Sequence, residues 1–206
     1  IGKKRKVFPR FYFLTMEELL DILANGNNPL MLFKEKNYMN KVVQAADKLE
    51  MSAGEGDRPR ITALTSCVGI EKVVFANNGL VLNGKVENYL QEILDLLILT
   101  IKNKAREYVA KPRNDRVAWI EGNYAQVNIL LNSVNWVHDV EAKFQELQGG
   151  NLDALKGYLN ESVAKLTDLI KLVQGDLSKA MRQKLMCLIT FDTHNRDVVQ
   201  TLIKEG

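Results

Sequence analysis

The chain has 206 residues, of which 46% are hydrophobic and 26% charged, with a formal net charge of +3 at pH 7. A chain of this length and composition folds into one large or two small globular domains, which excludes an intrinsically disordered protein. Much of the positive charge lies in residues 3–6, either a solvated basic lead-in or a nuclear import signal, so no broad basic face remains for a nucleic-acid partner. Cys67 and Cys187 lie far apart and match no disulfide or zinc spacing, which indicates a reducing compartment such as the cytoplasm.

Residues 8–14 concentrate aromatic side chains around one proline and one arginine. This density is typical of a short strand or extended plug wedged between layers, with Arg10 stacking on a ring or reaching a carbonyl oxygen. An ordinary buried strand is the alternative. The candidate docking contacts of this segment are Phe8, Arg10, Phe11, Tyr12 and Phe13.

A mixed stretch of helices and strands follows. Thr15 and Glu18 form the capping-box pattern, which predicts a helix over 16–24 that ends at Asn25 and Gly26. A second helix is predicted over 36–48. A loop at 54–59 then leads to short strands at 60–65 and 71–75, and residues 77–79 turn the chain out of the second strand. A β-hairpin or three-stranded patch of this size must pack on helices.

The rest of the chain, residues 84–206, is predicted to form four long helices. Apolar side chains recur three and four positions apart over 116–148 and 152–173, and two more helices are predicted over 86–109 and after a cap at Asp176. Such stripes form helix–helix seams, and we assign them no cofactor. The predicted fold is mostly α, an elongated antiparallel helical bundle with a small β-hairpin or short sheet in the N-terminal third. We expect a mixed α/β subdomain over 1–83 and a long-helix bundle over 84–206.

Residues that carry chemistry are few. His138 and His194 are the only histidines, and no cysteine–histidine cluster completes a metal site. The sequence contains no phosphate-binding glycine loop, and its strongest apolar run is too short to span a membrane. We therefore expect no catalytic, cofactor or metal site and no membrane partner.

Two features depart from simple core patterning. Trp119 lies on the opposite side of its predicted helix from Val117, so it faces either a second core layer or a separate contact. Residues 192–197 interrupt the last apolar stripe with polar side chains, which indicates a contact, a bend or a solvated helix face. The candidate contacts of these two features are Trp119, His194 and Arg196.

Five segments, in order along the chain, resemble dynein heavy chains. Residues 8–14 with 17–23 are similar to an aromatic segment and the following helix in the linker of these motors. Residues 61–66 with 71–75 resemble a hairpin of the same region, although its usual acidic and glycine centre is relaxed here. The other similar segments are 86–90, in which Tyr89 replaces a tryptophan, 136–141, and 188–190 with 194–199. The relaxed hairpin and compact spacing are more similar to an axonemal heavy chain than to the cytoplasmic one.

The resemblance implies a mechanical role. The dynein linker is a bent helical lever laid across a ring of six AAA modules, and its swing converts nucleotide-driven changes in the ring into force along the microtubule. This chain would be the C-terminal part of the linker, just before the first AAA module. Its start at Ile1, not at a methionine, also predicts a piece of a longer protein. It would hold no cofactor, with ATP and magnesium bound in the parent ring.

The resemblance also implies partners and a location. The AAA ring of the same heavy chain is the expected intramolecular partner, while microtubules bind through the parent motor and dynein intermediate and light chains through the parent tail. The expected location is the cytoskeleton, with the axoneme of a cilium or flagellum favoured. Gly149, Gly150 and the polar loop near Gly54 are candidate compliant points for switching. The alternative function is a non-motor helical scaffold or interaction module.

Overall fold

The computed structural model describes residues 2–53, 58–66, 71–109 and 116–205, so Cys67 and the loop near Gly54 lie outside the described residues. The chain divides into two compact units, Ile1–Asn103 and Lys104–Gly206. The division falls within helix α4 (Val86–Val109), well beyond the boundary expected near residue 84. It lies there because the N-terminal half of α4 packs into the core of the first unit.

The first unit begins with two short helical segments, and the strand or extended plug predicted for residues 8–14 is wrong. These segments are α1 (Gly2–Val7) and a turn of 3₁₀ helix, η1 (Pro9–Phe13). The three-residue repeat of a 3₁₀ helix brings Phe8 and Phe11 to one side, where both are fully buried with their rings edge to face and 4.9 Å apart. Arg10 donates from Nη1 to the carbonyl oxygen of Val42 at 2.8 Å, one of the two contacts predicted for it.

The capping box predicted at Thr15 is confirmed. Thr15 Oγ1 accepts a hydrogen bond from the Glu18 backbone N–H at 3.2 Å, and Glu18 Oε2 accepts one from the Thr15 N–H at 2.9 Å. The bond from the Thr15 backbone and the nearby Lys41 ammonium hold the pKa of Glu18 below its usual value, against the opposing effect of burial. Helix α2 (Met16–Ala24) therefore starts and ends where the sequence indicated.

The helix predicted over residues 36–48 is wrong. This stretch follows a π-helical turn, η2 (Met31–Glu35), and contains a single turn of helix, α3 (Met39–Val42), before strand β1 (Ala46–Ala53) begins. Asn37 and Ala45 have φ angles of 50° and 64°, which a right-handed helix cannot accommodate. Pairing with a strand further along the chain decides the conformation of β1, and local propensity does not.

A four-stranded antiparallel sheet is built around β2 (Pro59–Ser66). β1 pairs along one edge of β2, and β3 (Lys72–Val74) and β4 (Leu80–Val81) share the other edge. β2 and β3 lie where strands were predicted, whereas the sequence reading missed β1 and β4. Gly79 has a φ of +82°, and a Cβ there would lie 1.8 Å from the carbonyl oxygen of Ile61, so only glycine fits this turn.

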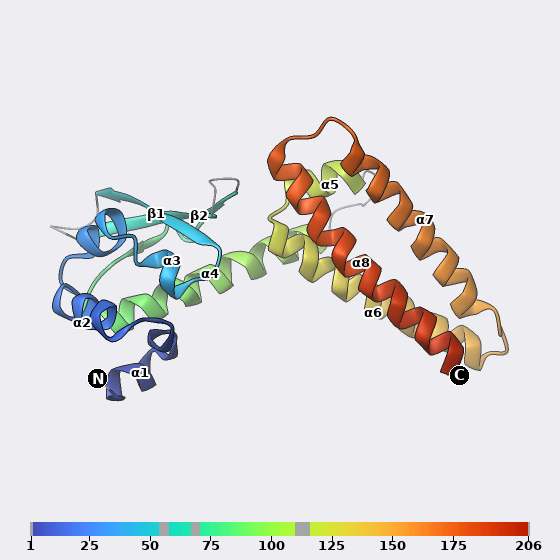
Figure 1. Cartoon of the computed structure of the whole chain (residues 1–206), viewed down its shortest axis with the longest axis horizontal. Coiled ribbons are helices and arrows are strands. Elements are labelled where there is room, and N and C mark those ends of the chain that lie inside the picture. The colour runs from blue at the N-terminus through green and yellow to red at the C-terminus, as the bar shows by residue number, and fades with distance from the viewer. Residues whose placement is uncertain (1, 54–57, 67–70, 110–115, 206) are drawn as a thin grey trace. The chain divides into compact units, whose positions relative to one another are not determined.

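Helix α4 has the predicted bounds and runs along the sheet in the first unit (Figure 1). Leu90 and Ile93 share one buried cluster with Ile61 of β2. Tyr89 is fully buried, packs edge to face on Phe33 with ring centres 6.1 Å apart, and donates from its hydroxyl to the carbonyl oxygen of Gly26 at 2.9 Å. Burial raises the pKa of Tyr89, and its one polar atom is satisfied.

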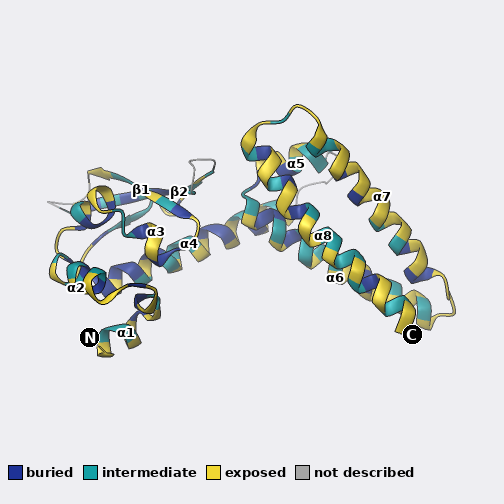
Figure 2. Cartoon of the chain, in the orientation of Figure 1, coloured by how far each residue is buried: buried dark blue, intermediate teal, exposed yellow. Residues whose placement is uncertain are grey.

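The described residues of the second unit form four further helices, drawn in yellow to red in Figure 1. Helix α8 packs against the other three, and one stripe of each long helix is buried in Figure 2. Helices α6 and α7 are joined by a short connection, and their antiparallel course confirms the predicted pairing of long helices. Their bounds are α5 (Arg116–Gly122), α6 (Ala125–Gln148), α7 (Ala154–Gln174) and α8 (Lys179–Glu205).

Two local predictions in the second unit are wrong. The single helix predicted over 116–148 is broken before Tyr124, which has extended backbone angles. Lys184 of α8 donates from Nζ to the carbonyl oxygens of Glu121 and Asn123, which satisfies the end of α5 through a contact distant in sequence. Helix α8 is capped by Ser178 and not by Asp176, since Ser178 Oγ accepts from the Met181 N–H at 3.1 Å.

We expect Phe11→Ala and Phe13→Ala to differ strongly in their effect on stability. Phe11 is 0% exposed and Phe13 is 70% exposed. Truncating a buried phenylalanine leaves a cavity and lowers the free energy of unfolding by about 3–5 kcal/mol, whereas a change at an exposed position costs about 0.5 kcal/mol or less. Urea unfolding followed by circular dichroism measures both, and equal losses would contradict this placement of the two rings.

The hydrogen bond of the Tyr38 hydroxyl stabilises the first unit, and this stabilisation is lost at strongly alkaline pH. Its hydroxyl donates to Asp21 Oδ2 at 2.6 Å, and this bond, burial and the nearby carboxylates raise the pKa of Tyr38 to about 12. In the unfolded chain a tyrosine ionises near pH 10, so the stability gained from this bond is complete below about pH 10 and is lost as the pH rises through about 12.

We therefore expect the difference in unfolding free energy between the wild type and Tyr38→Phe to shrink from about pH 10 to about pH 12. Between about pH 7 and 9 the difference should stay constant, which serves as the internal control. Denaturant unfolding at each pH measures it. A difference that stays constant across the alkaline range would show that the Tyr38 hydroxyl is not held by Asp21.

Candidate functional site

Polar side chains occupy core positions in the middle of helix α8. Leu188 and Val199 are buried, and Asp192 and Asn195 lie between them at the same spacing of four, three and four residues. Leu188 belongs to an apolar cluster with Ile120 and Leu169, whereas Val199 belongs to a separate cluster with Val140 and Tyr158. A polar layer therefore separates two apolar clusters within the second unit.

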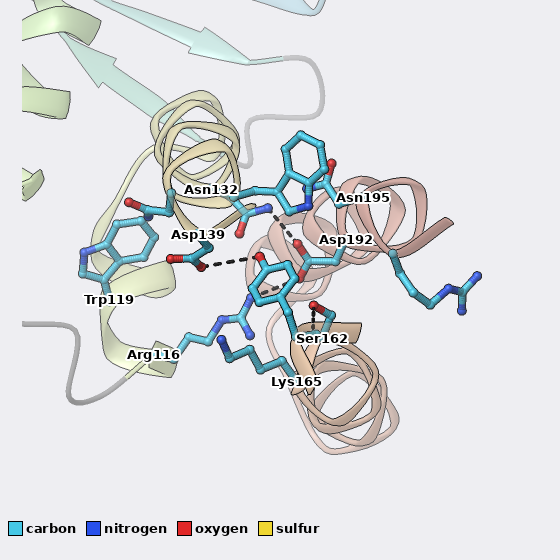
Figure 3. A pocket seen from close by; sticks show the side chains of 12 residues that line it. Arg116, Trp119, Asn132, Asp139, Ser162, Lys165, Asp192 and Asn195 are labelled. Atoms are coloured by element: carbon cyan, nitrogen blue, oxygen red, sulfur yellow. Dashed lines mark hydrogen bonds and ion pairs between the residues drawn. The ribbon is translucent and has the colours of Figure 1, made fainter. Parts of the chain in front are cut away.

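A cavity of about 370 Å³ lies at this polar layer (Figure 3). All four helices of the unit contribute to its lining, and the lining contains both aromatic rings and charged groups. The lining residues are Arg116 and Trp119 of α5; Asn132, Asn135, Trp136 and Asp139 of α6; Tyr158, Ser162 and Lys165 of α7; and Asp192, Asn195 and Arg196 of α8.

Asp192 connects three of these helices. Its Oδ2 lies 3.1 Å from Arg116 Nη2 of α5, and its Oδ1 accepts a hydrogen bond of 2.7 Å from Asn132 Nδ2 of α6. Its side chain is only 17% exposed, so the guanidinium neutralises a carboxylate that is largely out of water. Figure 3 shows both bonds converging on Asp192 inside the cavity.

A second polar contact joins α7 to α6. The Tyr158 hydroxyl donates to Asp139 Oδ2 at 3.5 Å, and Ser162 Oγ donates to the Tyr158 carbonyl oxygen at 2.8 Å. Burial, together with the negative charges of Asp139 and Asp192, raises the pKa of Tyr158 to about 12. Tyr158 is therefore a neutral hydrogen-bond donor at physiological pH, and it is not a base.

Several donors of the cavity lining have no partner among the described residues. The indole Nε1 atoms of Trp119 and Trp136 are buried and make no hydrogen bond. The Lys165 side chain, on an exposed position of α7, makes no ion pair or hydrogen bond within the described part of the chain. Its side chain extends on the same side of the cavity as Arg116 (Figure 3).

The structure brings together two of the sequence-predicted contacts. Trp119 and Arg196 both line the cavity, and Trp119 also packs edge to face on Tyr108 with ring centres 6.3 Å apart. Arg196 pairs with its neighbour Asp197 at 2.6 Å. His194 is exposed and does not line the cavity.

The predicted contacts in the first unit separate into two groups. Phe8 and Phe11 are core residues, and Arg10 is bonded to the backbone. Only Tyr12 and Phe13, 64% and 70% exposed, are available to a partner, and Arg5 lies over the Tyr12 ring with its guanidinium carbon 5.3 Å from the ring centre. Gly149 and Gly150 lie between α6 and α7, and Gly150 has a φ of +102°.

Most of the cavity lining, including Arg116, Asn132 and Lys165, is not predicted from the sequence. The interruption of the α8 stripe is visible there, but it does not give Asp192 a partner. One signal was available: Asp192 and Asn195 fall on the heptad positions of the stripe, which points polar groups inward. Which residues of α5, α6 and α7 meet them depends on how the helices pack.

Within residues 2–53, 58–66, 71–109 and 116–205, no group of three or more His, Cys, Asp or Glu side chains is placed to hold a metal ion. No helix in the same described ranges is long and apolar enough to cross a membrane. The lining carries three cationic and two anionic side chains, an arrangement suited to recognising a charged group.

Comparison with known proteins places the chain in a family. A family profile described as "Dynein heavy chain, N-terminal region 2" matches residues 1–108. The chain is 39% identical over 203 residues to the dynein alpha chain of the flagellar outer arm from Chlamydomonas reinhardtii, covering 95% of this chain and 4% of that protein.

Other similar proteins are dynein heavy chains of cilia and flagella. Dynein axonemal heavy chain 9 of Homo sapiens is 33% identical over 209 residues, covering 100% of this chain and 4% of that protein. The ciliary dynein beta chain of Heliocidaris crassispina is 31% identical over 204 residues, covering 97% of this chain and 4% of that protein. The chain thus spans about 4% of the length of these curated relatives. On these matches, the chain belongs to the dynein heavy chain family.

Proposed function

We propose that this chain is part of the mechanical linker of an axonemal dynein heavy chain, where it transmits force and carries no catalytic or nucleotide site of its own. The observation that carries the proposal is the match of residues 1–108 to N-terminal region 2 of dynein heavy chains. The ordered similarity of the remaining segments to the linker supports the same assignment for the second unit.

The helices of the second unit suit a lever. Helices α6, α7 and α8 have 24, 21 and 27 residues, and α8 packs along both of the others. Helices that share buried seams over such lengths resist bending, because bending would open packed side-chain contacts. Asp192 adds charged cross-links between helices at the point where the apolar seam is interrupted.

In this role the partner of the chain is the AAA ring of the same heavy chain, which would bind ATP and magnesium. Microtubules would be bound through the parent motor, and intermediate and light chains through the parent tail. The axoneme of a cilium or flagellum is the proposed location, because the relatives are named as axonemal, ciliary and flagellar dyneins.

A non-motor scaffold is the second candidate. The exposed rings of Tyr12 and Phe13 favour some contact with another protein surface, which either function would use. The lever is the better supported of the two, because the matches to dynein heavy chains extend over nearly the whole length of this chain.

We expect a helix-breaking substitution in α8 of the full heavy chain to uncouple motion from hydrolysis. Met186 is exposed in the N-terminal third of α8, beyond its first turn, so Met186→Pro removes a backbone hydrogen bond and costs about 3 kcal/mol or more of helix stability. The matched control is Met186→Ala, which keeps the helix. Microtubule gliding should slow for the proline variant alone while the basal ATPase of the ring is retained. Equal gliding velocities for both variants would overturn the lever proposal.

The connection between α6 and α7 is the proposed compliant point. Gly150 has a φ of +102°, a conformation that alanine adopts only with strain, and an added Cβ would meet no atom within 4 Å. Changing Gly149 and Gly150 to alanine should therefore alter the connection without a steric clash elsewhere. We expect reduced gliding velocity with the basal ATPase preserved.

The control for the glycine pair is Gly157→Ala. Gly157 is in helix α7, and a Cβ there also meets nothing within 4 Å. This change should stiffen the helix slightly and leave gliding velocity unaltered. Wild-type velocity in the Gly149 and Gly150 double variant would rule out compliance at this connection.

A further inference from the structure

The cavity of the second unit contains hydrogen-bond donors that have no partner among the described residues. Its two carboxylates are already bonded, Asp192 by Arg116 and Asn132, and Asp139 by Tyr158. Two donors of the lining have no partner among the described residues, the buried Nε1 of Trp136 and the ammonium of Lys165. A ligand that satisfies them must therefore supply acceptor atoms.

One cation of the cavity lining is without an ion pair. Arg116, Lys165 and Arg196 are the cationic side chains of the lining, and Arg196 is already paired with Asp197. Because Asp192 is paired with Arg116, the unpaired cation that remains is Lys165. An anion here would gain a charge-assisted hydrogen bond in a setting partly shielded from water.

The size and apolar part of the lining favour an organic anion. A volume of about 370 Å³ is far larger than a single water molecule and accommodates an acidic side chain with some water. The rings of Trp119 and Trp136 offer apolar surface to methylene groups, which a glutamate has and an inorganic ion lacks.

We propose that this cavity binds a carboxylate presented by an acidic side chain of a protein segment, with Lys165 as its ion-pairing group and the Trp136 indole N–H as a hydrogen-bond donor. The assignment does not depend on the lever role. It gives the polar layer a function: residues that interrupt the apolar seam form a receptor for a charged contact.

The composition of the chain makes this proposal easy to test. Trp119 and Trp136 are its only tryptophans, and both line the cavity. The two indole N–H signals in a ¹⁵N-labelled NMR spectrum therefore both report on this site, and Trp119→Phe assigns them. The probe is N-acetyl-glutamate N-methylamide, and its neutral isostere, N-acetyl-glutamine N-methylamide, is the matched control.

We expect the chemical shift of the Trp136 indole signal to change saturably as the glutamate probe is added. The affinity for the glutamine probe should be at least tenfold lower, because a hydrogen bond to a charged group is stronger than one to a neutral group. Lys165→Met should lower the affinity for the glutamate probe at least tenfold. Lys171→Met, an exposed position on the same helix outside the cavity, should leave its affinity unchanged.

Four results would overturn the proposal. One is the absence of any saturable shift of the Trp136 signal, and another is equal binding of the two probes. The third is binding that survives Lys165→Met unchanged. Inorganic phosphate is titrated in parallel, and tighter binding of phosphate than of the glutamate probe would replace the carboxylate assignment with a phosphate site.

Discussion

The packing of the second unit depends on how one carboxylate is satisfied inside a helical bundle. Asp192 occupies a position of α8 that would otherwise carry an apolar side chain, and it is largely removed from water. Arg116 and Asn132 supply the charge and the hydrogen bonds that such a group requires, and they come from two different helices. The position of α5 and α6 against α8 is thereby fixed at a point where apolar contacts are interrupted.

In the first unit, the small sheet depends on helices to complete its core. Four short strands cannot bury enough surface alone, so aromatic and aliphatic groups from helices complete the core. Phe8 and Phe11 enter from η1, and Tyr89 enters from α4 with its hydroxyl bonded to a carbonyl oxygen. An ion pair between the partly exposed Lys4 and the buried Glu87 also joins α1 to the start of α4.

Membership of the dynein heavy chain family and the construction of the two units lead to one functional account. In the proposed lever role, long helices with shared seams would carry load, while a polar layer and a glycine connection would provide places where contacts can change. The exposed rings of Tyr12 and Phe13 and the cavity around Lys165 are separate surfaces with different chemistry, one apolar and one charged.

Features that depend on local sequence could be predicted for this chain. They are the capping box at Thr15, the bounds of α4, the strands β2 and β3, and the ordered segments that identify the family. Tertiary contacts decided the rest. Residues 46–53 form a strand by pairing with β2, and α5 and α6 separate where Lys184 satisfies the helix end. Residues 9–13 form a 3₁₀ turn that buries Phe8 with Phe11. The cavity could not be predicted from the sequence, because its lining comes from four helices. Only the packing of these helices brings Arg116, Lys165 and Asp192 together. Periodicity shows which side of a helix is polar, but the partners of that side are set by three-dimensional packing.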